Sequence, residues 1–137
     1  MTRPIHASKL AAACALLALA GCAAFGPSTP EEQVKARAQE RRDAIVRGDH
    51  RRVYEYMTPG YRGVVSGETY AKSIGTAVIV VGASVESVQC ETLEKCIANV
   101  KVEIKPLAVR SFTGTITTYT NETWLMEAGQ WWYFENL

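Results

Sequence analysis

The stretch Ile97-Ala-Asn-Val-Lys-Val-Glu-Ile-Lys105 decides the fold class, because apolar and polar side chains alternate along it. Successive side chains of a strand point to opposite faces of a sheet. One face would carry Ala98, Val100, Val102 and Ile104, and the other Asn99, Lys101, Glu103 and Lys105. The stretch therefore predicts a strand of an antiparallel sheet that is buried on one face and wet on the other.

The segments on either side of this stretch also predict strands. Residues 112–126 form a long strand pattern, Ala128-Gly129 favours a tight turn, and residues 130–134 return as a last antiparallel strand. On the other side, residues 78–90 are rich in β-branched residues, and Gly82 indicates a bulge. We therefore expect an antiparallel meander.

Helices are predicted before the meander. Thr29-Pro30-Glu31-Glu32 is a helix start, in which Thr29 caps, Pro30 takes the first helical position and Glu32 completes a capping box. This helix should reach about Arg47, and Gly48 ends it.

Shorter elements should follow the first helix. Asp49 caps a short second helix, residues 61–65 read as a short strand, and Ser66 begins another short helix. Helices followed by a meander define an α+β domain. We expect a curved antiparallel sheet packed on a long N-terminal helix and two short helices.

Residues 1–21 have the pattern of a signal peptide. Arg3 and Lys9 precede an apolar run, Leu10 to Ala20, which is shorter than the about 20 residues that cross a membrane. The run ends in Leu19-Ala20-Gly21-Cys22, which resembles a bacterial lipobox. An ordinary secretory signal with an incidental cysteine is the alternative.

The lipobox resemblance implies cleavage before Cys22 and lipidation of its thiol. Residues 22–28 would then be a lipidated tether, in which six extended residues reach only about 20 Å. Ala23 follows the cysteine where an Asp would be the usual retention signal, which implies the outer membrane, facing the periplasm. The expected location is thus the bacterial cell envelope, with a membrane contact through the lipid on Cys22.

Cys90 and Cys96 remain in the folded part of the mature chain, because Cys14 leaves with the signal. The periplasm is oxidising, and the two cysteines flank a loop between two predicted strands. A redox-active pair is the alternative, but its usual spacing places two residues between the cysteines. The spacing here favours a structural disulfide.

Two motifs carry a resemblance to a known family. The first runs from Arg47-Gly48-Asp49 to Tyr61-Arg62, and the second is Glu122-Thr123-Trp124 followed by the hairpin 127–132. Together they resemble the nuclear-transport-factor-2-like superfamily. The resemblance implies that residues 29–137 form a cone-shaped α+β domain around a cavity that is open or filled.

Composition and residue types argue against several functions. With 15 Lys and Arg against 14 Asp and Glu, the net charge is +1, and nothing indicates a nucleic-acid partner. The mature chain has neither a nucleotide-binding glycine motif nor a metal-ligand spacing, so we expect no cofactor and no metal. Enzymes of the resembled superfamily carry an Asp or a His–Asp pair in the cavity. Here Asp43 and Asp49 do not lie at matching positions, and His50 is expected in the solvated first turn of a short helix.

Glu122 is the carboxylate of greatest interest, because it shares a strand face with Trp124. It could line the cavity and act as a base or bind a ligand, or it could pair with an arginine such as Arg41 or Arg62. The candidate cavity residues are Tyr54, Tyr56, Tyr61, Glu122 and Trp124.

Trp131 and Trp132 must point to opposite faces if they lie in a strand. One ring can fill the core, and the other can face solvent or a partner. With Tyr119 they are the candidate interface residues. The arginines of the first helices, which include Arg37 and Arg52, are predicted to form a solvated face.

These features favour a membrane-anchored periplasmic lipoprotein that acts as a non-catalytic binding or interaction module. Its partner would be a protein, a second copy in a homodimer, or a small apolar ligand. An isomerase- or cyclase-like enzyme that uses Glu122 and a cavity tyrosine is one alternative. An accessory subunit of an envelope assembly is the other.

Overall fold

The computed structural model describes residues 28–75, 78–107 and 113–136. Within them lie the helices α1 (Pro30–Val46), α2 (His50–Glu55), α3 (Pro59–Val64) and α4 (Gly67–Ser73), and the strands β1 (Val78–Thr92), β2 (Lys95–Pro106), β3 (Ile116–Glu127) and β4 (Gln130–Phe134). The predicted signal peptide, Cys22 and tether residues 22–27 lie outside the described residues, as does the predicted beginning of the third strand at Phe112.

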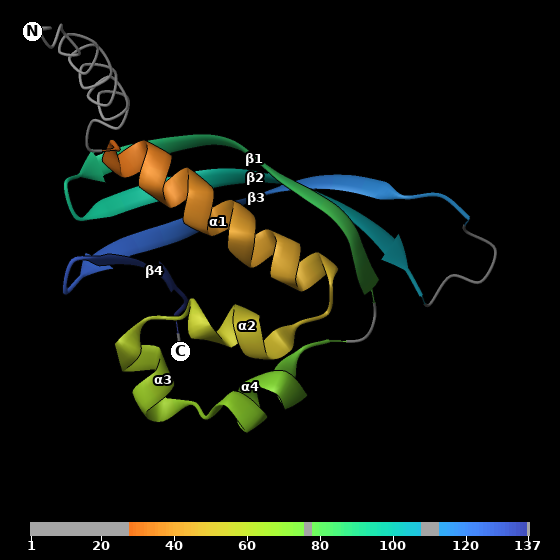
Figure 1. The fold of residues 1–137 in the computed structure, drawn as a ribbon. Helices are drawn as coiled ribbons and strands as arrows, with labels where there is room; N and C mark the ends of the chain where they lie inside the picture. The colour runs from red at the N-terminus through yellow and green to blue at the C-terminus, as the bar shows by residue number, and fades with distance from the viewer. Residues whose placement is uncertain (1–27, 76–77, 108–112, 137) are drawn as a thin grey trace, which may run out of the picture.

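The strands form one antiparallel sheet in the order β1-β2-β3-β4, which confirms the predicted α+β meander (Figure 1). The register shifts between Val80 and Gly82, where the sequence predicted a bulge. Ala128 and Gly129 join β3 to β4 with positive φ angles of 52° and 77°. Such a two-residue turn matches the twist of a hairpin.

The beginning of α1 has the predicted capping box. The Thr29 hydroxyl accepts from the Glu32 amide at 3.2 Å, and the Glu32 carboxylate accepts from the Thr29 amide at 2.9 Å. Gly48 follows the helix with φ of 69°, a conformation that glycine adopts without a steric cost. Asp49 caps α2 by accepting from the Arg52 amide at 3.1 Å, as predicted.

The prediction of a strand at residues 61–65 is wrong, because helix α3 lies there. Thr58 caps this helix by accepting from the Tyr61 amide at 3.3 Å, and Pro59 occupies its first turn. This is the same Thr-Pro helix start as at Thr29-Pro30, and here the cap prevails over the β-branched residues that follow. Three short helices, rather than two, therefore follow α1 within the described residues.

Helix α1 lies across one face of the sheet, over β1 and β2 (Figure 1). Val34 and Ala38 of α1 pack against the alternating residues of β2, and Ala98 and Val100 are fully buried there. A second cluster lies between α1, α2 and α4, and consists of Ala44, Val53, Met57 and Tyr70. The inward face predicted for residues 97–105 is thus the buried one.

Strand β4 is joined to the helical layer through its backbone. The Tyr133 amide donates to the Tyr56 carbonyl at 2.8 Å, and the Thr58 amide donates to the Tyr133 carbonyl at 3.1 Å. These two bonds satisfy backbone groups on the outer side of an edge strand. They also hold the end of α2 against the sheet.

Cys90 and Cys96 face each other across the β1–β2 pair and form a disulfide. Replacing both by alanine should lower the free energy of unfolding by about 2 kcal/mol, because the bond closes a short loop in the unfolded chain. Denaturant unfolding with and without reductant measures the effect. The reductant should destabilise the wild type and leave the double variant unchanged, and a wild type that is indifferent to the reductant would contradict the prediction.

Candidate functional site

The five residues predicted to line a cavity lie in two different parts of the core. Tyr56 and Trp124 belong to the larger cluster, with ring centroids 6.5 Å apart, and Glu122 contacts Trp124. Tyr54 and Tyr61 pack instead on the smaller cluster around Tyr70. The structure brings Tyr56, Glu122 and Trp124 together and places the other two tyrosines elsewhere.

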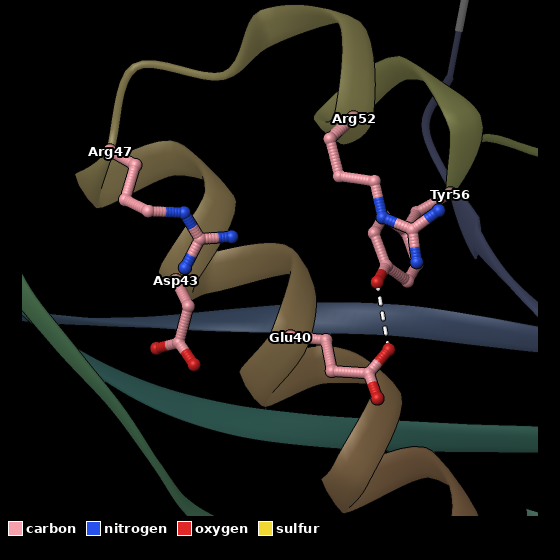
Figure 2. Close-up of a pocket in the computed structure, with 5 residues that line it drawn as sticks. All are labelled: Glu40, Asp43, Arg47, Arg52 and Tyr56. Atoms are coloured by element: carbon pink, nitrogen blue, oxygen red, sulfur yellow. Dashed lines mark hydrogen bonds between the residues drawn. The ribbon is translucent and has the colours of Figure 1, made fainter.

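Tyr56 also borders a notch of about 240 Å³ between α1 and α2. Its other lining residues are Glu40, Asp43, Arg47 and Arg52. The Tyr56 hydroxyl donates to Glu40 at 2.8 Å, and the Arg52 guanidinium lies 4.9 Å from the centre of the Tyr56 ring (Figure 2). The notch is therefore lined by charges of both signs.

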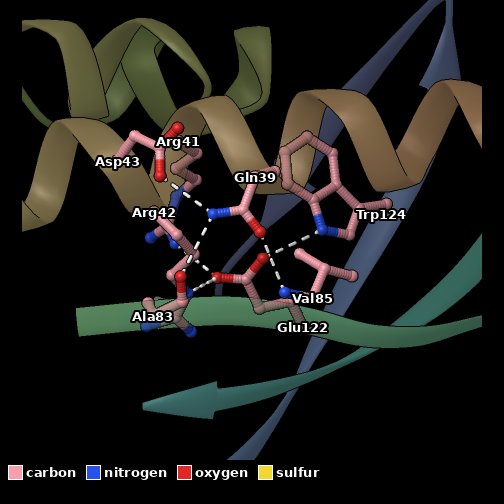
Figure 3. Close-up of polar contacts among 8 residues, drawn as sticks. All are labelled: Gln39, Arg41, Arg42, Asp43, Ala83, Val85, Glu122 and Trp124. Atoms are coloured by element: carbon pink, nitrogen blue, oxygen red, sulfur yellow. Dashed lines mark hydrogen bonds and ion pairs between the residues drawn. The ribbon is translucent and has the colours of Figure 1, made fainter. Parts of the chain in front are cut away.

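Glu122 is 1% exposed and pairs with two consecutive arginines of α1 (Figure 3). Its Oε1 lies 2.6 Å from Arg41 Nη1 and 2.7 Å from Arg42 Nε. Its Oε2 accepts from Trp124 Nε1 at 3.1 Å. The sequence left open whether Glu122 lines a cavity or pairs with an arginine such as Arg41 or Arg62. In the structure Glu122 pairs with Arg41, and it does not pair with Arg62.

Both carboxylate oxygens of Glu122 are therefore occupied by donors within the protein. The Arg41 guanidinium also lies 3.6 Å from the centre of the Tyr133 ring. Burial lowers the pKa of Arg42, although the neighbouring Glu122 opposes that shift. An arginine stays charged nonetheless, so this cluster is a buried ion network that joins α1 to β3 and β4.

Gln39 joins the same helix to the edge of the sheet (Figure 3). Its Oε1 accepts from the Val85 amide at 2.9 Å, and its Nε2 donates to the Ala83 carbonyl at 3.1 Å. The Gln39 amide thereby satisfies backbone groups of β1 as a neighbouring strand would. Helix α1 is thus held to β1 by Gln39 and to β3 by the Glu122 network.

The three predicted interface residues lie in different surroundings. Trp131 is 2% exposed, packs in the core and donates from Nε1 to Gln33 at 3.2 Å. Tyr119 is 61% exposed. Trp132 is half-buried, and two guanidinium groups lie over its ring, that of Arg62 at 4.8 Å and that of Arg37 at 5.6 Å.

Arg37 also lies 5.0 Å from the centre of the Tyr56 ring, so cations and rings alternate. We call this set the arginine–aromatic row, and it consists of Arg52, Tyr56, Arg37, Trp132 and Arg62. Sequence reasoning placed Arg37 and Arg52 on a solvated face and missed the row. The three arginines belong to three helices, and no local spacing relates them to Trp132.

The residues considered for acid–base or metal chemistry have structural roles. Asp49 caps α2, and Asp43 accepts from Gln39 at 2.8 Å. Within the described ranges there is no group of three His, Cys, Asp or Glu residues that could hold a metal ion. No helix among the described residues is long and apolar enough to cross a membrane.

Burial raises the pKa of Tyr70 and Tyr133 above the ordinary value of 10.0. Below that pH both phenols are neutral in the folded and the unfolded chain. At higher pH the unfolded chain releases protons that the folded chain retains, so the free energy of unfolding should fall as pH rises through this range.

Urea unfolding between about pH 8 and about pH 11 measures this decrease. In Tyr70→Phe and in Tyr133→Phe, the free energy of unfolding should fall less steeply with rising pH than in the wild type. Tyr119→Phe, at an exposed position, should show the same slope as the wild type. Equal slopes in all three variants would refute the assignment to the buried phenols.

Comparison with known proteins shows a fold likeness. No protein-family model matches the chain, and no curated protein matches its sequence. Among solved structures, the chain is similar to a SEC-C motif containing protein from Rhodopseudomonas palustris, with a TM-score of 0.54 and 12% identity. The match covers 78% of this chain and 76% of that protein. The described residues thus define an α+β domain with an open antiparallel sheet, an architecture also present in that solved structure.

Proposed function

We propose that the protein is a lipoprotein of the bacterial envelope, anchored through Cys22, whose domain at residues 29–137 is a non-catalytic interaction module. The sequence Leu19-Ala20-Gly21-Cys22 after an apolar run supports the anchor. The order of helices before a meander supports a cone-shaped domain similar to the nuclear-transport-factor-2-like superfamily. The expected location is the outer membrane, facing the periplasm.

The observation that supports a non-catalytic role most strongly is that both carboxylate oxygens of Glu122 already contact donors within the protein. A general base needs an oxygen within hydrogen-bond reach of its substrate. Inside the core, Glu122 Oε1 instead accepts from Arg41 and forms an ion pair with Arg42, and Oε2 accepts from Trp124. This arrangement supports a structural role over the isomerase- or cyclase-like alternative.

The packing of the aromatic residues favours a protein partner over a small apolar ligand. Trp124 is fully buried and packs edge-on against Tyr56 and Tyr133, with ring centroids 6.5 and 6.1 Å apart. These rings fill space that a ligand would need. Trp132 and its arginines are of the residue types most enriched at protein interfaces.

The anchor is tested by Cys22→Ser expressed in a bacterial host, with Cys14→Ser as the matched control. Wild type and Cys14→Ser should fractionate with membranes and carry acyl mass on the mature N-terminus. Cys22→Ser should lose both properties, because one thiol carries the lipid. Membrane association of Cys22→Ser equal to that of the wild type would overturn the anchor.

The interaction role is tested by chemical cross-linking of the anchored protein in cells. We expect a discrete complex of constant stoichiometry, either with another envelope protein or with a second copy. If the protein remained monomeric at all cross-linker concentrations, the proposal that the domain is an interaction module would be wrong. A complex with many subunits would favour the accessory-subunit alternative.

A further inference from the structure

We propose that Arg37 and Arg62, which lie over the Trp132 ring, form the docking site for an acidic segment of a protein partner. The inference rests on the proposed interaction module and names the chemistry of its partner. The site combines a half-buried indole with two guanidinium groups, at 5.6 and 4.8 Å from the ring centre. One guanidinium comes from α1 and the other from α3.

Among the residues that the structure describes, the positive charges at this site have no carboxylate partner. Arg52, at the other end of the arginine–aromatic row, pairs with Glu55 at 2.8 Å. In contrast, no Asp or Glu among the described residues lies within ion-pair distance of Arg37 or Arg62. Two like charges are therefore held at one ring without neutralisation.

The groups around Arg37 confirm this imbalance. The Gln130 amide, with its oxygen turned toward Arg37, accepts from Nη2 at 2.8 Å and from Nη1 at 3.2 Å, but it is neutral. The charge of Glu40 acts on Arg37, but the Glu40 carboxylate accepts from the Tyr56 hydroxyl and forms no ion pair with Arg37. Arg37 is thus held by Gln130 and two aromatic rings and Arg62 by the Trp132 ring, and no described carboxylate lies within ion-pair distance of either guanidinium.

A site with two guanidinium groups at one indole ring is suited to bind carboxylate groups. A guanidinium binds a carboxylate with charge-assisted hydrogen bonds, and stacking on a ring fixes its plane before the partner arrives. Two guanidinium groups from different helices suit two acidic side chains of one extended segment.

The test uses the lipidated mature protein, ¹⁵N-labelled and held in neutral detergent micelles, with an oligoglutamate peptide as the probe. Its readout is the set of three indole N–H resonances, which report on three separate places. Trp132 Nε1 donates to the Glu127 carbonyl, Trp124 Nε1 to Glu122 and Trp131 Nε1 to Gln33. An oligoglutamine peptide is the uncharged control.

Oligoglutamate should shift the Trp132 resonance saturably at low salt, leave the other two indoles in place, and act more weakly as salt rises. Arg37→Gln and Arg62→Gln should each weaken binding about tenfold, since each removes one charge-assisted contact. Arg51→Gln is the matched control, because the Arg51 side chain is 92% exposed and lies near Glu55. It should change the affinity by less than about twofold.

Three results would overturn the docking site: no shift of Trp132, equal weakening by Arg51→Gln, or an equal shift by oligoglutamine. A Trp132 shift by vesicles of anionic phospholipid, without one by the peptide, would assign the arginines to lipid headgroups and also overturn it. The proposal of an interaction module is tested separately, by the cross-linking experiment. A cross-linked complex that survives Arg37→Gln with Arg62→Gln leaves the module in place and removes only this docking site.

Discussion

Replacing Glu122 by glutamine should lower the free energy of unfolding by about 3–5 kcal/mol, one of the two largest effects expected for this chain. The change preserves the size of the side chain but removes its charge. Arg41 and Arg42 then remain in the interior, with side chains 6% and 12% exposed, without a counter-charge. Denaturant unfolding of the purified protein measures the loss.

Two further variants test whether the loss of stability comes from the ion network or from any change of a carboxylate on this strand. Glu127→Gln changes an exposed carboxylate at the end of the same strand and should stay within about 0.5 kcal/mol of the wild type. A triple variant with methionine at positions 41 and 42 and leucine at 122 should recover most of the stability, because it removes all three charges together. If Glu122→Gln were as stable as Glu127→Gln, the ion network would have no structural role.

Replacing Trp124 by alanine should cost about 3–5 kcal/mol, because Trp124 is fully buried between two other rings. Trp124→Phe keeps a ring and removes only the indole donor, so its smaller cost measures the hydrogen bond to Glu122 together with the lost ring volume. The exposed control is Tyr119→Ala, which should stay within about 0.5 kcal/mol of the wild type.

The two sites should be coupled, since Trp124 Nε1 donates to Glu122 Oε2 at 3.1 Å. The double variant Glu122→Gln with Trp124→Phe should deviate from additivity by about 0.5–3 kcal/mol in urea unfolding. Additive losses would mean that the indole and the carboxylate act independently, contrary to the observed contact.

Much of the fold was predictable, because its signals lie between neighbours in the sequence. The capping box at Thr29 and Glu32 involves residues three apart, and the buried face of β2 follows from strict alternation. The disulfide was predictable because Cys90 and Cys96 flank one hairpin loop. The strand prediction at residues 61–65 is wrong because Thr58 and Pro59, which the pattern indicated as a break, begin a helix there.

The candidate site was predictable only in part. The shared strand face of Glu122 and Trp124 identified the carboxylate that matters, and an arginine partner was one of the open alternatives. The sequence could not show that Arg42 joins the pair, because residue 42 comes near residue 122 only when α1 packs on the sheet. The separation of Tyr54 and Tyr61 from Trp124 likewise depends on α3, which sequence reasoning missed.

By itself, the sequence determined the helix starts at Thr29, Asp49 and Ser66, the meander, the alternating buried face of residues 97–105 and the cysteine pair, since each depends on local geometry or on a short loop. Only the tertiary structure decided that Glu122 is held by Arg41 and Arg42, and that Arg37 and Arg62 meet at Trp132. Arg37, Arg62 and Trp132 come from α1, α3 and β4, so their meeting depends on how the helices pack against the edge of the sheet. Whether a charge is neutralised or left open to a partner is therefore a property of packing.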